Sequence, residues 1–204
     1  QGALNALNGC YDMMGRMEMY RRYHYEIHDC ISDDTEVGGQ LGNYEHADAQ
    51  DLSRFISTSD NDIAREYWQY SYRGISRCND VISRVPNIEM EEDLKNRILA
   101  EARFLRALFH FNLNNAFAGV PIIDHPLTQD EYYDTDRSTR LEVYEFIIRE
   151  LNDIRNFLPV NYSGLDVGRA GRGAANALLA KVYLFVASFK EYDHYIEWNE
   201  RGFD

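Results

Sequence analysis

Two histidines on one predicted helix are the first residues whose spacing could support chemistry. His24 and His28 are four residues apart, which places two imidazoles on one helical face, as in helical zinc sites. In the zinc-protease motif a glutamate directly follows the first histidine, whereas here Tyr25 follows it and Glu26 comes one place later. The carboxylate would then point away from a shared metal ion. The spacing therefore favours an ordinary amphipathic helix face, and we predict no metal and no other cofactor.

A glycine-rich run before a predicted helix could bind phosphate, because helix N-termini attract anions. Residues 168–173 read Gly-Arg-Ala-Gly-Arg-Gly, but a phosphate-binding loop needs a lysine and a serine or threonine after its last glycine, and here two alanines follow. We expect a tight turn in which Arg169 fixes the loop by hydrogen bonds. The sequence also lacks a Gly-X-Ser-X-Gly elbow and a cysteine in a nucleophile context, so no catalytic residues are predicted.

Acidic residues cluster in one segment without helical periodicity. Asp33, Asp34 and Glu36 lie there. A glycosidase needs two carboxylates about 5–10 Å apart across a cleft, and the sequence does not exclude such a pair. Solvated loop acids are the simpler interpretation. We therefore expect a protein that is not an enzyme.

The same segment carries groups suited to sugar binding. Aromatic rings stack on the C–H faces of sugars, while planar amides and carboxylates can hydrogen-bond adjacent hydroxyls. Most of the 15 tyrosines lie at helical core spacings, but one stands in this segment beside an asparagine. We nominate five ligand-binding residues from chemistry and position alone: Asp33, Asp34, Asn43, Tyr44 and Asn61.

Long helices must position these groups. Proline is scarce, with 4 in 204 residues, and apolar residues recur at helical spacing along most of the chain. An irregular segment longer than about 12–15 residues is usually functional or disordered, which draws attention to residues 32–60. The expected order is a first helix over 1–31 with its periodic part at 4–27, an irregular loop over 32–60, a helix pair over 61–118, a linker over 119–138, a second helix pair over 139–190, and over 191–204 the start of a missing C-terminal part.

Capping patterns mark where these helices begin and end. The second helix should begin near Asp60–Asp62 and end before Pro86, and the third should begin at Glu91. The fourth opens with a capping box, Thr139 followed three residues later by Glu142. The third has apolar residues on two faces, which predicts a helix packed between neighbours. Helix pairs of this kind indicate an all-α, TPR-like superhelical solenoid with one long irregular loop segment.

Composition excludes several classes of function. A net charge of −13 leaves no basic patch for nucleic acid or anionic lipid. The longest apolar runs, residues 177–180 and 182–187, are far shorter than the roughly 20 residues of a membrane-spanning helix. The chain does not start with a secretion leader, so any targeting signal is expected to have been removed or omitted. Three dispersed cysteines, at positions 10, 30 and 78, predict small buried thiols, although one disulfide remains open.

Three blocks of residues occur in an order that a known family shares. The first is a helix led by tryptophan, the second a charged and apolar helix that ends in Gly-Val-Pro, and the third a Gly-Arg pair before an alanine-rich helix. They comprise, in order, Trp68, Tyr72, Ile75, Asn79 and Ile82; Ala100 to Ala107 with Phe111, Phe117, Gly119 and Pro121; and Gly168 and Arg169 with Leu178 to Leu184. Over about residues 60–190 the chain thus resembles the SusD/RagB family of outer-membrane nutrient-binding lipoproteins.

The resemblance implies a function as well as a fold. The chain would be the helical, TPR-containing N-terminal part of a SusD-like protein, forming one domain over 1–204. Such a protein binds an oligosaccharide at the cell surface without catalysis and delivers it to a SusC-like, TonB-dependent outer-membrane transporter. It would belong to a Gram-negative bacterium and attach through a lipid anchor that this chain lacks. The family's C-terminal half supplies much of the ligand site, so this chain should hold only part of it.

The motif residues are expected to be structural. Glu101, Arg103 and Arg106 lie on a helix that is apolar on two sides, where isolated buried charges would cost several kcal/mol each. We therefore expect hydrogen-bonded ion pairs with neighbouring helices. The resemblance assigns structural roles likewise to Trp68, Tyr72, Asn79, Gly119, Pro121 and Arg169.

Two other kinds of binding remain open. A TPR-type scaffold could bind protein segments in a concave groove lined by asparagine, lysine and arginine. A SusD-like protein could also capture a peptide in place of a glycan. Glycan binding is the leading prediction because the three blocks occur in the family's order.

Overall fold

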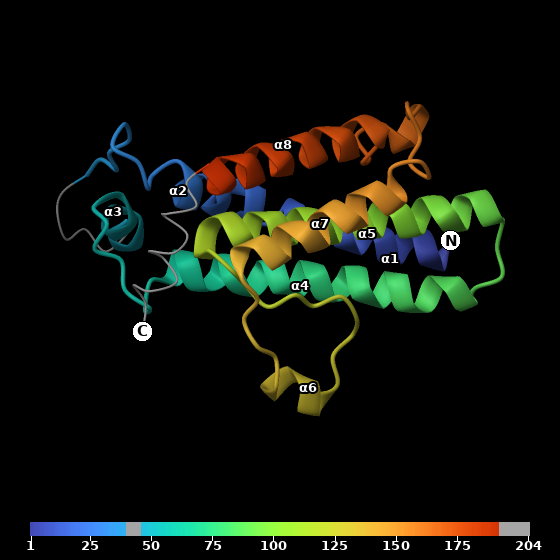
Figure 1. The fold of residues 1–204 in the computed structure, drawn as a ribbon, viewed down its shortest axis with the longest axis horizontal. Coiled ribbons are helices and arrows are strands. Elements are labelled where there is room, and N and C mark those ends of the chain that lie inside the picture. The colour runs from blue at the N-terminus through green and yellow to red at the C-terminus, as the bar shows by residue number, and fades with distance from the viewer. Residues whose placement is uncertain (40–45, 192–204) are drawn as a thin grey trace.

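The structure is a computed structural model that describes residues 1–39 and 46–191, and in these ranges it consists of helices joined by loops (Figure 1). The two longest helices, α4 (Asp62–Arg84) and α5 (Glu92–Phe117), lie side by side and run in opposite directions (Figure 1). None of the helices in these ranges is long and apolar enough to cross a membrane.

Helix α5 is the centre of the fold. It packs against α4 on one side and α7 (Arg140–Ile154) on the other, and α8 (Arg172–Glu191) packs on α7. Helix α1 (Gly2–Met14) contacts both α4 and α5. The two apolar stripes of α5 are buried accordingly. The predicted all-α, TPR-like superhelix of helix pairs is therefore confirmed. The three cysteines are buried free thiols.

Side-chain caps begin the long helices. The side chain of Asn61 accepts a hydrogen bond from the amide of Ala64 at the start of α4, and Glu91 caps α5 in the same way. Thr139 and Glu142 form the predicted capping box of α7. These caps satisfy amides that have no partner within the helix, which explains why the sequence pattern located the helix starts well.

Two glycines permit close approach of neighbouring segments. A Cβ atom on Gly74 of α4 would lie 2.6 Å from the ring of Phe109 on α5, so these helices are in contact through a small residue facing a large one. A Cβ atom on Gly119 would lie 2.2 Å from the carbonyl oxygen of Ser138. The chain leaving α5 therefore passes directly against the chain entering α7, and Gly119 is required there for steric reasons.

The prediction of one continuous first helix over residues 4–27 is wrong. Helix α1 stops before Gly15, a π-helical turn follows at Met17–Arg21, and α2 (Tyr23–His28) is a separate short helix. Met19 has non-helical φ and ψ of −119° and −130° and is fully buried. Burial of this side chain against α4 breaks the helix, although the apolar spacing on its own resembles an unbroken one.

Short helices also occur in the two segments predicted to be irregular. The loop over 32–60 contains α3 (Ala47–Ser53), which buries Ala49 and Leu52, so the prediction that the whole segment is irregular is wrong. The linker over 119–138 contains α6 (Gln129–Tyr133), which projects from the bundle on its own loop (Figure 1). Residues 192–204, where the start of a C-terminal part was predicted, lie outside the described residues.

Candidate functional site

A buried ion-pair network links α5 to α7. Arg103 Nε donates to Glu150 Oε1 at 3.0 Å, and Arg106 Nε donates to Glu150 Oε2 at 3.1 Å. Arg106 Nη1 also donates to Asn79 Oδ1 on α4 at 2.8 Å, and the Asn79 amide donates to the Ile123 carbonyl at 3.0 Å. The network therefore joins three helices and the linker after α5. Glu150 is the carboxylate partner that the sequence did not identify.

A second network surrounds Glu101, which is fully buried. The hydroxyls of Tyr11 and Tyr162 donate to its carboxylate at 2.7 and 3.0 Å, and Arg169 Nη1 donates at 3.2 Å. Burial and the nearby carboxylate raise the pKa of Tyr11, so its hydroxyl stays protonated and remains a donor. Arg169 also bonds Asp166, which ties the turn before α8 to α5. Arg169 therefore holds the turn before α8 against α5 through its bonds to Asp166 and Glu101.

Aromatic side chains of α4 pack against the C-terminal end of α5. The ring centroid of Trp68 lies 5.0 Å from that of Tyr72 and 5.1 Å from that of Phe117. The Tyr72 hydroxyl donates to the Pro121 carbonyl at 2.8 Å. Trp68, Tyr72 and Pro121 thus lie in the packing between α4 and the linker.

Three of the predicted ligand-binding residues, Asp33, Asp34 and Asn61, lie at the α2–α3 end of the bundle, which we call the loop end. Asp33 and Asp34 are exposed, and neither carboxylate forms a hydrogen bond within the described residues. Asn61 is only 3% exposed, and its amide donates to the Asp48 carbonyl while its oxygen caps α4. Asn61 therefore does not face solvent, as a ligand contact would require. Asn43 and Tyr44 lie outside the described residues.

The two histidines at the loop end point at a tyrosine. Tyr67 Oη lies 2.8 Å from His24 Nδ1 and 3.4 Å from His28 Nε2. Burial, with a smaller contribution from His28, lowers the pKa of His24 to about 4, so the ring is neutral at pH 7. Across residues 1–39 and 46–191 there is no group of three potential metal-ligating side chains. The pair instead fixes α2 on α4.

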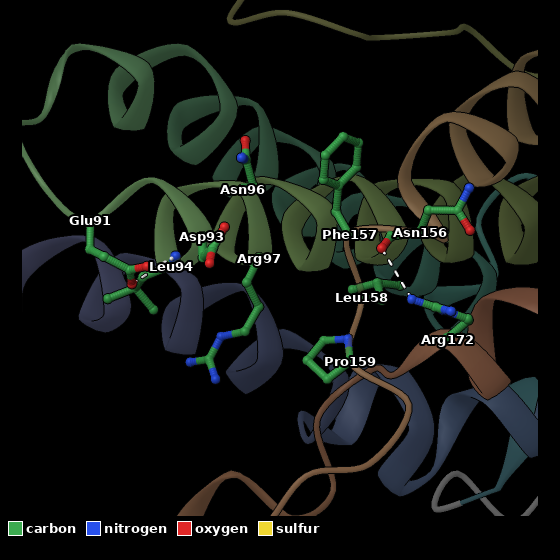
Figure 2. Close-up of a pocket in the computed structure, with 10 residues that line it drawn as sticks. All are labelled: Glu91, Asp93, Leu94, Asn96, Arg97, Asn156, Phe157, Leu158, Pro159 and Arg172. Carbon is green, nitrogen blue, oxygen red and sulfur yellow. Dashed lines mark hydrogen bonds between the residues drawn. The ribbon is translucent and has the colours of Figure 1, made fainter.

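A pocket lies at the opposite end of the bundle, which we call the pocket end (Figure 2). It encloses about 510 Å³ between the first turns of α5, the turn after α7 and the start of α8. Phe157, 55% exposed, stands in this pocket together with Asn96 and Asn156. A neighbouring pocket of about 390 Å³ shares Asn96 and Phe157. Sequence reasoning missed this region because its residues come from separate elements without a common motif.

Together these features define a helical scaffold for binding. The long helices are fixed by buried ion pairs, while exposed Asp33 and Asp34 lie at one end and half-exposed Phe157 lies at the other. Residues 9–184 match the family model described as "Starch-binding associating with outer membrane", SusD-like. This match spans most of the chain, and the chain belongs to the SusD/RagB family.

Similar proteins share the fold. The chain is 27% identical over 205 residues to SusD-like protein P2 of Formosa agariphila, covering 98% of this chain and 39% of that protein. A solved structure titled "Laminarin binding SusD-like protein" is 31% identical, with a TM-score of 0.81 and coverage of 93% of this chain and 41% of the other. Surface glycan-binding protein A from Bacteroides fluxus is 28% identical, with a TM-score of 0.78 over 94% and 41% of the two chains. The chain thus spans about two fifths of these relatives.

Proposed function

We propose that this chain is the helical part of a non-catalytic glycan-binding protein of the outer membrane, with residues 1–204 forming one helical domain. The family match over residues 9–184, to a family described as starch-binding, is the observation that carries the proposal. The likeness to a laminarin-binding protein and to a surface glycan-binding protein supports it.

In this proposal the protein captures an oligosaccharide at the surface of a Gram-negative cell and passes it to a SusC-like, TonB-dependent transporter. A lipid anchor holds the whole protein at the membrane. Asp33 and Asp34 are proposed ligand contacts because their carboxylates are exposed and can accept hydrogen bonds from sugar hydroxyls. Asn43 and Tyr44 of the same loop complete the proposed set.

Affinity gel electrophoresis of the 204-residue chain tests the binding claim. Gels that contain starch or laminarin should retard the chain relative to a polysaccharide-free gel, and a non-binding protein of similar charge serves as the control. Equal migration in every gel, with no heat in a calorimetric titration of maltoheptaose or laminarihexaose, would argue against glycan binding. Binding of peptides without any binding of sugars would favour peptide capture instead.

Two further experiments test the absence of catalysis and the partner. Incubation of the chain with starch or laminarin should release no reducing sugar. Release that disappears in Asp33→Asn or Asp34→Asn would show a hydrolase. The whole protein, purified from its own outer membrane in mild detergent, should carry a TonB-dependent transporter with it, and recovery of a soluble partner alone would contradict the delivery role.

A further inference from the structure

One aromatic ring stands between the two pockets of the pocket end. Phe157 and Asn96 line both the 510 Å³ pocket, drawn in Figure 2, and the 390 Å³ pocket, so the two pockets adjoin, and we call them together the Phe157 groove. The residues that line the smaller pocket include the buried ion pair of Arg106 and Glu150. The volumes fall within the range of small-ligand sites, about 300–1,000 Å³.

The backbone on either side of the ring is held in place. The next residue, Leu158, is only 1% exposed and anchors the turn in the core. The amide of Arg172 donates to the Pro159 carbonyl at 2.9 Å, and its Nη2 donates to the Asn156 carbonyl at 3.2 Å (Figure 2). A ring that is half-exposed on a fixed turn loses little conformational entropy when a ligand stacks on it.

Two planar amides accompany the ring. The side chains of Asn96 and Asn156 form no hydrogen bond within the part of the chain that the structure describes. Each amide offers two donors and an acceptor, a combination that suits adjacent sugar hydroxyls. Phe157 supplies the flat apolar face on which the C–H side of a sugar ring can lie.

The charges of the groove do not favour an anion. Arg97 Nη1 is bonded to Asp166 at 3.0 Å, and its Nε lies 3.5 Å from Glu101. Two further carboxylates, Glu91 and Asp93, line the pocket. The lining of this pocket carries two arginines, Arg97 and Arg172, and these two carboxylates, so its formal charges balance and a phosphate or an acidic peptide would meet little net attraction. A neutral polyhydroxylated ligand meets no such obstacle.

We propose that the Phe157 groove is a second oligosaccharide-binding site, separate from the loop end. This proposal rests on the proposed glycan-binding function and adds a site whose residues all lie within the described part of the chain. Phe157 stacks on one sugar ring, and Asn96 and Asn156 bond the hydroxyls of that ring and the next.

Calorimetric titration of the 204-residue chain with laminarihexaose and maltoheptaose tests the site. Phe157→Ala should raise the Kd of whichever sugar binds about tenfold, because it removes the stacking surface. Phe157→Tyr keeps a flat ring and should stay within about twofold of the unaltered chain. The double change Asn96→Ala with Asn156→Ala should weaken binding to a similar extent as Phe157→Ala. Circular dichroism and thermal melting establish that each variant is folded.

Tyr133→Ala is the matched control, because Tyr133 is an 81% exposed aromatic residue on α6 that lines neither of the two pockets. It should bind sugar as the unaltered chain does. Unchanged affinity in folded Phe157→Ala, with binding lost in Asp33→Asn combined with Asp34→Asn, would overturn the second site and leave the proposed function standing. Absence of sugar binding by the unaltered chain would overturn both, and saturable binding of a peptide alone in the groove would overturn the choice of ligand.

Discussion

The two ends of the bundle are stabilised in different ways. The pocket end and the middle of α5 are held by buried charges, with Glu101 and Glu150 each bonded to more than one neighbouring side chain. At the loop end the side-chain contacts of Tyr67 and Asn61 are neutral, since Tyr67 meets two imidazoles and Asn61 caps α4, and the buried carboxylate of Glu26 pairs with Arg22 only four residues away. The carboxylates of Asp33 and Asp34 remain in solvent.

This difference separates residues that maintain the fold from residues that are free to contact a ligand. A buried carboxylate with two or three donors cannot be changed without leaving those donors unsatisfied. An exposed carboxylate can be changed at little cost to stability. The family's motif residues fall in the first class, and the candidate ligand residues Asp33, Asp34 and Phe157 fall in the second.

The largest expected effect comes from breaking the buried network. Glu150→Ala should lower the free energy of unfolding by about 3–5 kcal/mol, because it leaves the guanidinium of buried Arg106 without its carboxylate. Asp153→Ala, which removes an exposed partner of Arg103, should cost less than about 1 kcal/mol. Urea unfolding measures both. Similar losses for the two variants would mean that burial of the network contributes little.

A steric change at the end of α5 should have the next largest effect. Gly119→Ala should lower the free energy of unfolding by about 1–3 kcal/mol. The new Cβ would lie 2.2 Å from the Ser138 carbonyl oxygen, so the chain after α5 or the chain before α7 would have to move. Gly173→Ala is the control, since a Cβ there meets no atom within 4 Å and alanine favours the helix. Equal stability of the two variants in urea would contradict the close approach.

At the loop end, Asn61→Ala should lower the free energy of unfolding by about 1 kcal/mol, because the α4 cap and the bond to Asp48 are lost. Asp34→Asn should leave stability unchanged, because its carboxylate is exposed. Thermal melting compares the two. A stable Asn61→Ala variant with altered sugar affinity would restore Asn61 as a ligand contact and contradict the structural role.

The smallest predicted effect is a pH dependence at the same end. The pKa of His24 is about 4 in the fold and about 6.5 when unfolded, so the unfolded state takes up a proton first as the pH falls. Stability should therefore be full above pH 6.5 and decline toward pH 4, by about 0.5–1 kcal/mol from this half-exposed ring.

His24→Asn should make that decline shallower, and the slope that remains includes contributions from His28 and His110, whose pKa values are also lowered, and from carboxylates with a lowered pKa such as Asp124 and Asp166. Urea unfolding between pH 4 and pH 7 measures the slopes. Identical slopes for the variant and the unaltered chain would show that folding does not lower the pKa of His24.

Sequence predicted what local patterns determine. The capping box at Thr139 is a local signal, and it forms as predicted. The break at Met19 depends on burial against α4, which apolar spacing does not reveal. Asn61 shows the same limit, because an amide in a loop suits a helix cap and a sugar equally well.

The pocket end could not be predicted because it depends on tertiary structure. Asn96, Phe157 and Arg172 come from α5, the turn after α7 and the start of α8, and only the packing of these helices brings them together. The partner of Arg106 was hidden for the same reason, since Glu150 is one of many acids in the sequence. Pocket residues and ion-pair partners of this kind are identified only when the distances between helices are known.

Chemical-shift mapping tests the central claim most directly, because it asks both whether the chain binds glycan and where. Laminarihexaose and maltoheptaose would be added to the ¹⁵N-labelled 204-residue chain. We expect saturable shifts at the side-chain amides of Asn96 and Asn156 and at the backbone near Phe157, together with shifts near Asp33 and Asp34. A spectrum that does not change with either sugar, while the chain remains folded, would contradict the account.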